Sequence, residues 1–188
     1  MRTIKNRTLL LVFLAGLLMT PALADASAQA PKSPQQRQAD VQARLQKEVR
    51  HVLVMLPFYS VFDNLEYRVD GDHVILSGQV TQPNIKSDAE RAVKSIEAVS
   101  AVGNKIEVLP LSPNDDRIRR AEFRAIYSAP NLQKYAVQAV PSIHIIVKGG
   151  HVTLVGVTAN EGDKNTANIV AKSVSGVFSV TSQLTVEK

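Results

Sequence analysis

The 188-residue sequence contains no cysteine. Without thiols, the chain has no disulfide framework, no thiolate metal site and no N-terminal cysteine for lipid attachment. It also lacks two common catalytic signatures, the G-x-S-x-G nucleophile elbow and a glycine-rich phosphate loop that leads into a helix. We therefore expect no enzymatic activity and no cofactor, and a fold that apolar cores stabilise without covalent cross-links.

The N-terminal segment is typical of a secretory signal peptide. Three cations precede an apolar run at residues 9–19, which is closed by the small-residue triplet Ala22-Leu23-Ala24. The run is shorter than the roughly 20 residues that span a bilayer, so we expect cleavage after Ala24 rather than an uncleaved anchor. Ala28 and Ala30 are alternative cleavage points. The predicted mature chain is secreted and periplasmic, without an integral membrane span.

Much of the positive charge lies in this N-terminal segment. Removing residues 1–24 takes the formal charge from +5 to +2, because the rest of the chain holds 19 Lys and Arg against 17 Asp and Glu. Nucleic-acid binding depends on a strongly basic surface, which a nearly neutral chain does not provide. We expect no nucleic-acid partner, and only local basic patches remain as candidates for anion binding.

One stretch of the sequence occurs twice. Residues 69–110 return, without gaps, as residues 147–188, and 13 of the 42 positions are identical at a constant offset of 78. Apolar character is kept at further positions, so the repeat is a repeat of buried faces. Such a pattern is typical of a duplicated domain.

Each of the two units shows the same order of patterns: helix, strand, strand, helix, strand. The tight turn makes the first two strands antiparallel, and the helix between the second and third makes those two parallel. The predicted fold class is α+β, with two αββαβ units. Each unit is a small three-stranded mixed sheet with two helices packed on one face and the other face open. We expect the units to pack together, because about 70 residues alone form a marginal core.

The patterns also give boundaries. The predicted organisation is a signal peptide at 1–24, a flexible tether at 25–37, domains at 38–110 and 115–188, and a linker at 111–114. In the first domain we expect helices over 38–56 and 83–99 and strands over 65–69, 74–80 and 102–108.

Several residues that resemble site residues have simpler explanations. His144 and His151 lie on one predicted hairpin, but no carboxylate or cysteine accompanies them at ligand spacing, so we expect no metal site. Ser142 and His144 lie two residues apart on one strand, without a signature that would complete a catalytic group. The glycines repeated in both units fit turns and strand ends, and they are Gly71, Gly149, Gly78 and Gly156.

The segment 115–127 carries the polar cluster that we interpret as a binding site. At 100° per residue its three arginines fall within about 60° of one another, with two aromatic residues beside them. Ile118, Ala121 and Ala125 lie on the other side of the helix. Guanidinium groups bind phosphate, and amphipathic aromatic side chains suit a membrane interface. The candidate lipid-binding residues are Arg117, Arg120, Phe123, Arg124 and Tyr127. The alternative is a solvated basic face whose arginines pair with acids.

The two units resemble the BON domain, named for bacterial osmotically inducible and nodulation proteins. The resemblance rests on a Val-x-Leu-x-Gly pattern after a turn, at residues 74–78 and 152–156, followed by an Ala-rich helix and a Val-rich strand. It implies a non-catalytic envelope module associated with osmotic stress, outer-membrane integrity, anionic-phospholipid contact or periplasmic chaperoning. In relatives with two BON domains the first helix of the second domain contacts lipid, and residues 115–127 form that helix here. Some relatives are lipoproteins, and this chain departs from them because it lacks the cysteine.

We therefore expect an envelope-stress module whose partner is an anionic phospholipid surface. A second interpretation is a protein-binding or chaperone module that uses the open sheet faces or the apolar connections at 57–59 and 135–140. A third is an ion or small-ligand sensor, since some BON proteins bind potassium. The sequence leaves the oligomeric state and the physiological partner open.

Overall fold

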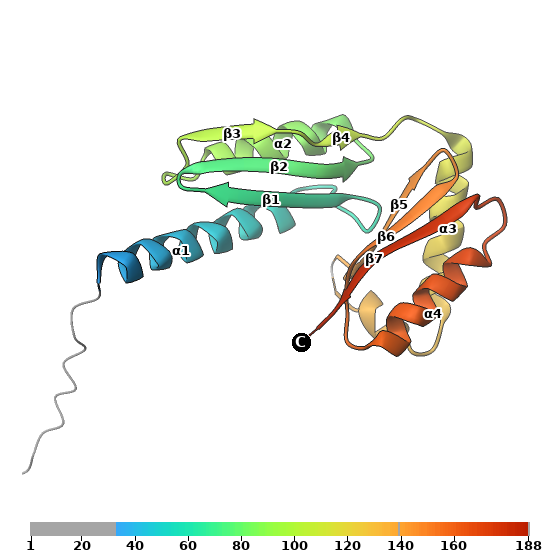
Figure 1. Ribbon diagram of the computed structural model, residues 1–188. Coiled ribbons are helices and arrows are strands. Elements are labelled where there is room, and N and C mark those ends of the chain that lie inside the picture. Colours follow the sequence, from blue (N-terminus) through green and yellow to red (C-terminus); the bar gives the residue numbers. More distant parts are fainter. Residues whose placement is uncertain (1–32, 139, 188) are drawn as a thin grey trace, which may run out of the picture. The chain divides into compact units, whose positions relative to one another are not determined.

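The computed structural model describes residues 33–138 and 140–187. The predicted signal peptide and most of the predicted tether lie outside the described residues. The described chain forms two αββαβ units in succession (Figure 1). The predicted fold class is therefore confirmed.

The first unit packs two helices on one face of a mixed sheet. Its elements are α1 (Pro34–Val54), β1 (Asn64–Asp70), β2 (His73–Val80), α2 (Pro83–Lys94), β3 (Ala101–Asn104) and β4 (Glu107–Val108). β2 lies in the middle, antiparallel to β1 and parallel to β3 and β4. Alternate residues of β2 are buried against apolar residues of both helices, as the period of two requires. The fully buried side chains of this core include Val49, Val74, Leu76, Ile85 and Ala89.

Helix α1 begins at Pro34, four residues before the start that the sequence predicted. Ser33 caps it: the Ser33 hydroxyl accepts a hydrogen bond from the Gln36 N–H, and the Gln36 side chain accepts one from the Ser33 N–H. This reciprocal capping box satisfies two backbone donors, and proline suits the first helical position. The prediction of a flexible tether was wrong for residues 34–37, because apolar periodicity does not register a polar first turn.

The predicted third strand of the first unit is interrupted. Residues 105 and 106 separate β3 from β4, although both pieces pair with β2 at the same offset of 28 residues. The Asn104 side chain donates to the Lys86 carbonyl at 2.9 Å and accepts from the Ile106 N–H at 3.1 Å. These bonds hold the strand at its break and tie it to α2.

The second unit repeats this arrangement, and α3 and α4 cover the same face of its sheet (Figure 1). β6 lies between β5, to which it is antiparallel, and β7, to which it is parallel. Its core is built from fully buried apolar side chains of the helices and strands, such as Ile118, Ile126, Ile145 and Leu154. The elements are α3 (Pro113–Ser128), η1 (Gln133–Ala136), β5 (Ile143–Lys148), β6 (His151–Thr158), α4 (Glu161–Lys172) and β7 (Ser179–Val186).

One glycine in each central strand is required by a close backbone approach. Gly78 and Gly156 have φ angles of 107° and 131°, and a Cβ atom at either would collide with a carbonyl oxygen of the facing segment, at Asn64 or at Ser142. Residues other than glycine rarely adopt such φ angles. The structural explanation that the sequence favoured for these two glycines is confirmed.

The two units contact each other, as expected. The Ile145 N–H donates to the Val61 carbonyl at 2.8 Å, and the Lys148 ammonium pairs with Glu107 at 2.6 Å. The expectation of an open second face is wrong for β5, because Ile146 points away from α3 and α4 and is still buried. It lines a cavity together with Leu109 of the first unit.

Candidate functional site

The first turn of α3 is fixed onto the second unit. Ser112 caps the helix by accepting a hydrogen bond from the Asp115 N–H at 3.2 Å, and Pro113 occupies the first helical turn. The buried Asp115 carboxylate accepts hydrogen bonds from the N–H groups of Gly149 and Gly150, at 2.9 and 2.8 Å. The helix thus begins at Pro113, inside the predicted linker, and its start is tied to the β5–β6 turn.

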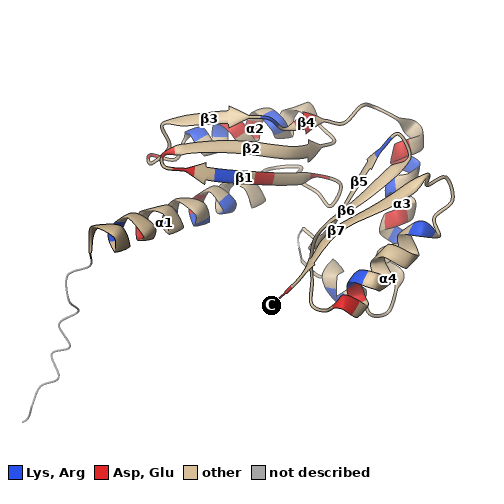
Figure 2. Cartoon of the chain, in the orientation of Figure 1, with Lys and Arg blue, Asp and Glu red and all other residues tan. Residues whose placement is uncertain are grey.

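The three arginines that the sequence singled out lie on the exposed side of α3. Arg117, Arg120 and Arg124 are all exposed, and basic residues are visible along this helix in Figure 2. The Arg117 guanidinium donates to the Ser175 carbonyl at 3.3 Å and to the Asn114 side-chain oxygen at 3.1 Å. One guanidinium is therefore anchored to the turn before β7, while the other two extend the basic face along the helix.

The acids of α3 do not neutralise this face. Asp115 is buried and bonded to backbone N–H groups, Glu122 is fully buried, and Asp116 pairs with the buried Arg119. Within the described part of the chain, no ion pair joins an acid to any of the three exposed arginines. The alternative interpretation was that the arginines of this face pair with acids, and the structure differs from it. The three guanidinium groups can therefore bind an external anion.

The two aromatic candidates differ in their surroundings. Phe123 is 37% exposed and packs edge-on against Phe62, with ring centroids 6.2 Å apart. Tyr127 is buried, and its hydroxyl donates to the Ile143 carbonyl. Burial raises the pKa of the Tyr127 hydroxyl above its usual range. Tyr127 therefore does not lie at the surface beside the arginines, because β5 covers the last turn of α3, which a helical projection does not include.

Two charged residues of α3 were missed because they face the core. Arg119 is 5% exposed, and its guanidinium bonds to Asp116 and, at 2.6 Å, to the Val147 carbonyl. Neither buried oxygen of Glu122 has a hydrogen-bond partner among the described residues. Burial raises the pKa of the Glu122 carboxyl to about 8. Charged residues in an amphipathic pattern are normally assigned to the solvent side, so the sequence carried no signal for these positions.

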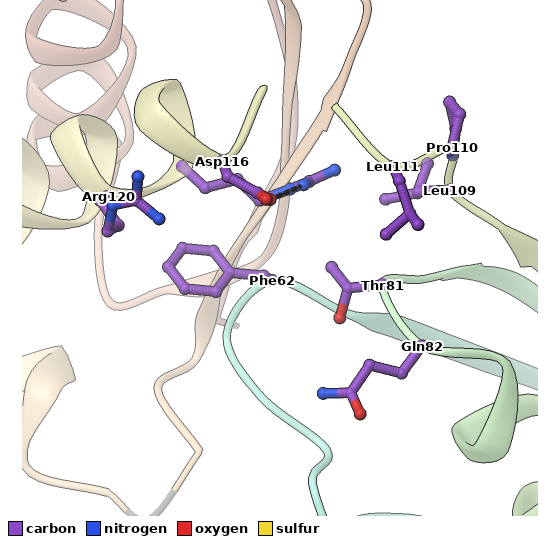
Figure 3. Close-up of a pocket in the computed structure, with 9 residues that line it drawn as sticks. Phe62, Thr81, Gln82, Leu109, Pro110, Leu111, Asp116 and Arg120 are labelled. Carbon is purple, nitrogen blue, oxygen red and sulfur yellow. Dashed lines mark hydrogen bonds and ion pairs between the residues drawn. The ribbon is translucent and has the colours of Figure 1, made fainter. Parts of the chain in front are cut away.

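A cavity of about 410 Å³ lies beside the basic face (Figure 3). Arg120 and Asp116 of α3 line one side of it, and Thr81 and Gln82 from the connection between β2 and α2 line another, with Phe62 between them. Its lining thus combines the exposed Arg120 guanidinium and the Asp116–Arg119 ion pair with neutral polar and apolar groups. The cavity can admit a small polar group that approaches Arg120.

The histidines and the serine considered as site residues each contact other groups. His144 stacks on Tyr59, with ring centroids 5.7 Å apart, while His151 contacts Phe178 and the Ser179 hydroxyl. Burial lowers the pKa of the His144 imidazole. The Ser142 hydroxyl donates to the Val157 carbonyl. Across residues 33–138 and 140–187 there is no group of three or more metal-ligating side chains.

The apolar connections that the sequence proposed for protein binding come together. Tyr59, from the connection after α1, and Val140 and Pro141, from the connection before β5, line one cavity of about 520 Å³. Met55, which also lines it, is 68% exposed, and Phe58, which precedes Tyr59 in the chain, is 69% exposed. This apolar groove is a second candidate surface.

Among the helices in the described ranges, none is both long enough and apolar enough to cross a bilayer. Solved structures that are similar to this chain include the C-terminal domain of CdsD, a structural protein of the type III secretion system of Chlamydia trachomatis. It is 12% identical, covers 78% of this chain and 99% of its own, and has a TM-score of 0.28. A second structure of CdsD is 11% identical, covers 77% and 92%, and has the same TM-score. This likeness is too low to carry a functional argument.

The family comparison is more informative. No curated protein matches the chain. The BON domain matches twice, over residues 33–110 and 114–188, which correspond to the two αββαβ units and leave only residues 111–113 between them. BON domains are non-catalytic binding domains of proteins that are typically periplasmic or membrane-associated. With both units matched and the fold repeated in each, the chain belongs to the BON-domain family as a tandem BON-domain protein.

Proposed function

We propose that this protein is an envelope-stress module that binds anionic phospholipid surfaces through the exposed face of α3. The supporting observation is that Arg117, Arg120 and Arg124 are exposed without an acidic partner among the described residues. The acids that share the helix are buried or paired with Arg119. Phosphate headgroups offer the anionic oxygens that guanidinium groups bind best.

The expected interaction is weak and reversible. A basic side chain near an anionic membrane surface contributes about 1 kcal/mol, and the attraction decays within a Debye length. The contribution of the three arginines to the adsorption therefore falls as the salt concentration rises. Phe123, which is partly exposed beside them, adds an apolar contact at the interface.

The proposal also places the protein in the cell envelope. Residues 1–24 have the pattern of a signal peptide, and BON-domain proteins are typically periplasmic or membrane-associated. The periplasmic side of an envelope membrane presents anionic phospholipid, so the expected location and the expected ligand agree. Mass spectrometry of the N-terminus of the protein recovered from the periplasm tests the cleavage after Ala24.

Co-sedimentation with vesicles tests the lipid proposal. Vesicles that contain phosphatidylglycerol should retain the protein at low salt, and phosphatidylcholine vesicles should not. Replacing Arg117, Arg120 and Arg124 by Glu should abolish the retention. The charge-matched control replaces the exposed α1 residues Arg44, Lys47 and Arg50 by Glu and should keep most of it. Failure of the wild type to bind anionic vesicles would overturn the proposal.

A second candidate function is protein binding at the apolar groove. The favouring observation is that the groove joins the two apolar connections. Phe58, which precedes the groove residue Tyr59 in the chain, is also exposed and has a φ angle of 67°. An exposed aromatic side chain on a strained backbone is rarely kept without a role. This function predicts that the protein suppresses aggregation of an unfolded client, that Phe58→Ser weakens this effect, and that the arginine replacements leave it unchanged.

A further inference from the structure

The turn between α4 and β7 holds an exposed aromatic ring in a fixed place. Phe178 is 76% exposed, yet its N–H donates to the Gly150 carbonyl at 2.9 Å. Its ring packs over Gly150, where a Cβ atom would lie 2.6 Å from the ring carbon Cδ2. The His151 ring lies beside it, with centroids 5.9 Å apart. The exposure of Phe178 is therefore part of an ordered turn.

Arg117 contacts the same turn. Its guanidinium donates to the Ser175 carbonyl and lies so close to Gly176 that a Cβ atom there would collide with Nη2. Gly176 also has a φ angle of 91°, which favours glycine. Two glycines thus make room, one for the cation and one for the ring, in neighbouring turns of the second unit.

The first unit provides an internal comparison at the offset of 78. The equivalent turn keeps the same backbone bond, from the Ser100 N–H to the Asp72 carbonyl at 2.9 Å. There Asp72 replaces Gly150, Ala98 replaces Gly176 and Ser100 replaces Phe178. A hydrogen bond from the Ser100 side chain lowers the pKa of the exposed Asp72 carboxyl. The fold therefore forms this turn with an acid and a serine, and the aromatic ring is a property of the second unit alone.

The combination in the second unit fits an anionic membrane surface. An exposed phenyl ring gains free energy when it leaves water, and an adjacent guanidinium holds a phosphate at the same depth as the headgroups. In the first unit, by contrast, the exposed carboxylate of Asp72 would be repelled by anionic lipid. The charges and the apolar ring thus favour contact between an anionic membrane and this end of the second unit.

We propose that Phe178 inserts into the boundary between headgroups and acyl chains while Arg117 binds a lipid phosphate beside it. This inference rests on the proposed lipid-binding function and adds an apolar anchor to it. It predicts that binding has two parts: a salt-sensitive part from the arginines of α3, and a part that persists at higher salt because burial of an apolar ring is not screened.

A tryptophan at position 178 tests the insertion directly. The chain has no tryptophan, so Phe178→Trp creates a single fluorescent reporter, and Ser100→Trp at the equivalent turn of the first unit is the matched control. With phosphatidylglycerol vesicles, the emission of the Phe178→Trp protein should shift to the blue and be quenched by lipids brominated on their acyl chains. The emission of the Ser100→Trp protein should show neither change.

The substitution Phe178→Ser tests the energetic contribution. Because the ring is exposed, this change should leave the thermal unfolding midpoint nearly unchanged, while vesicle affinity should fall about tenfold. The affinity that remains should still decrease with salt.

These measurements separate the inference from the function on which it rests. If Phe178→Trp binds vesicles without a blue shift or quenching, the anchor is refuted and the lipid function stands. Equal changes in the emission of the Ser100→Trp protein would also refute the anchor. So would a blue shift that depends on protein concentration in the absence of vesicles, because it would reveal self-association. If wild-type protein does not bind vesicles at all, the proposed function itself fails.

Discussion

The Tyr135 hydroxyl donates a hydrogen bond to the Asp163 carboxylate at 2.6 Å and accepts one from the Ala159 N–H at 2.8 Å. Asp163 also accepts from the Lys134 ammonium at 2.6 Å. The Lys134 ammonium, and to a smaller extent the Tyr135 hydroxyl, lowers the pKa of the Asp163 carboxyl. Through these bonds the connection after α3 is held against the start of α4, and its residues Leu132 and Tyr135 are part of the second core.

Replacing Tyr135 by Phe should destabilise the second unit. The change removes one donor and one acceptor at a largely buried position, so we expect the free energy of unfolding to fall by about 1–3 kcal/mol. Tyr67→Phe is the control, because the Tyr67 hydroxyl bonds to the Gln46 carbonyl at an exposed position where water can replace it. Urea titrations of both variants measure the difference. Equal losses would show that the Asp163 cluster has no special role.

Stability should depend on pH through Glu122. Its pKa is about 8 in the folded chain and about 4.5 when exposed, so the folded state binds the proton more tightly. The resulting stabilisation is fully present below about pH 4.5 and is lost as pH rises through about 8. Urea unfolding of the wild type at intervals across this range should show the decline.

The variant Glu122→Gln isolates this effect. It keeps the shape of the side chain but cannot ionise, so the decline between pH 4.5 and 8 should become shallower. Observation of the Glu122 carboxyl carbon by NMR gives the pKa independently. An unchanged slope in the variant, or a titration near 4.5 in the folded protein, would contradict the prediction.

The features that the sequence predicted correctly are local ones. The alternation of Leu65, Tyr67 and Val69 and the helical spacing of Ala89 and Val93 depend only on neighbours along the chain, and they predicted the elements and the sheet faces. The three exposed arginines followed from the same reasoning, because the exposed side of a helix is a local property.

Other features depend on partners that lie far away in the sequence. Arg119 is buried because the Val147 carbonyl, 28 residues away, accepts its hydrogen bond. Tyr127 is buried because β5 offers the Ile143 carbonyl. A helical projection contains neither partner, so it places both side chains by type alone. The exposed Phe178 was also missed, because an apolar residue just before a strand is normally assigned to the core.

The strand glycine Gly78 should tolerate substitution less well than the turn glycine Gly71. Both have positive φ angles, 107° and 65°, but a Cβ atom at Gly71 meets nothing within 4 Å, whereas one at Gly78 collides with the Asn64 carbonyl. Gly71→Ala should cost about 1 kcal/mol from backbone strain, and Gly78→Ala clearly more, because the β1–β2 pairing must also shift. Thermal unfolding followed by circular dichroism measures both. A smaller loss for Gly78→Ala would contradict the close approach of the two strands.

The last prediction separates stability from lipid binding within α3. Tyr127→Phe removes the donor to the buried Ile143 carbonyl, so the free energy of unfolding should fall by about 1–2 kcal/mol. Because the Tyr127 side chain faces the core, retention on phosphatidylglycerol vesicles should stay unchanged for the folded protein. Arg120→Glu with Arg124→Glu should do the reverse, since these exposed side chains leave the core intact while they invert the charge of the binding face. If Tyr127→Phe weakened vesicle retention while the protein stayed folded, the hydroxyl would have to reach the membrane, and its assignment to the core would be wrong.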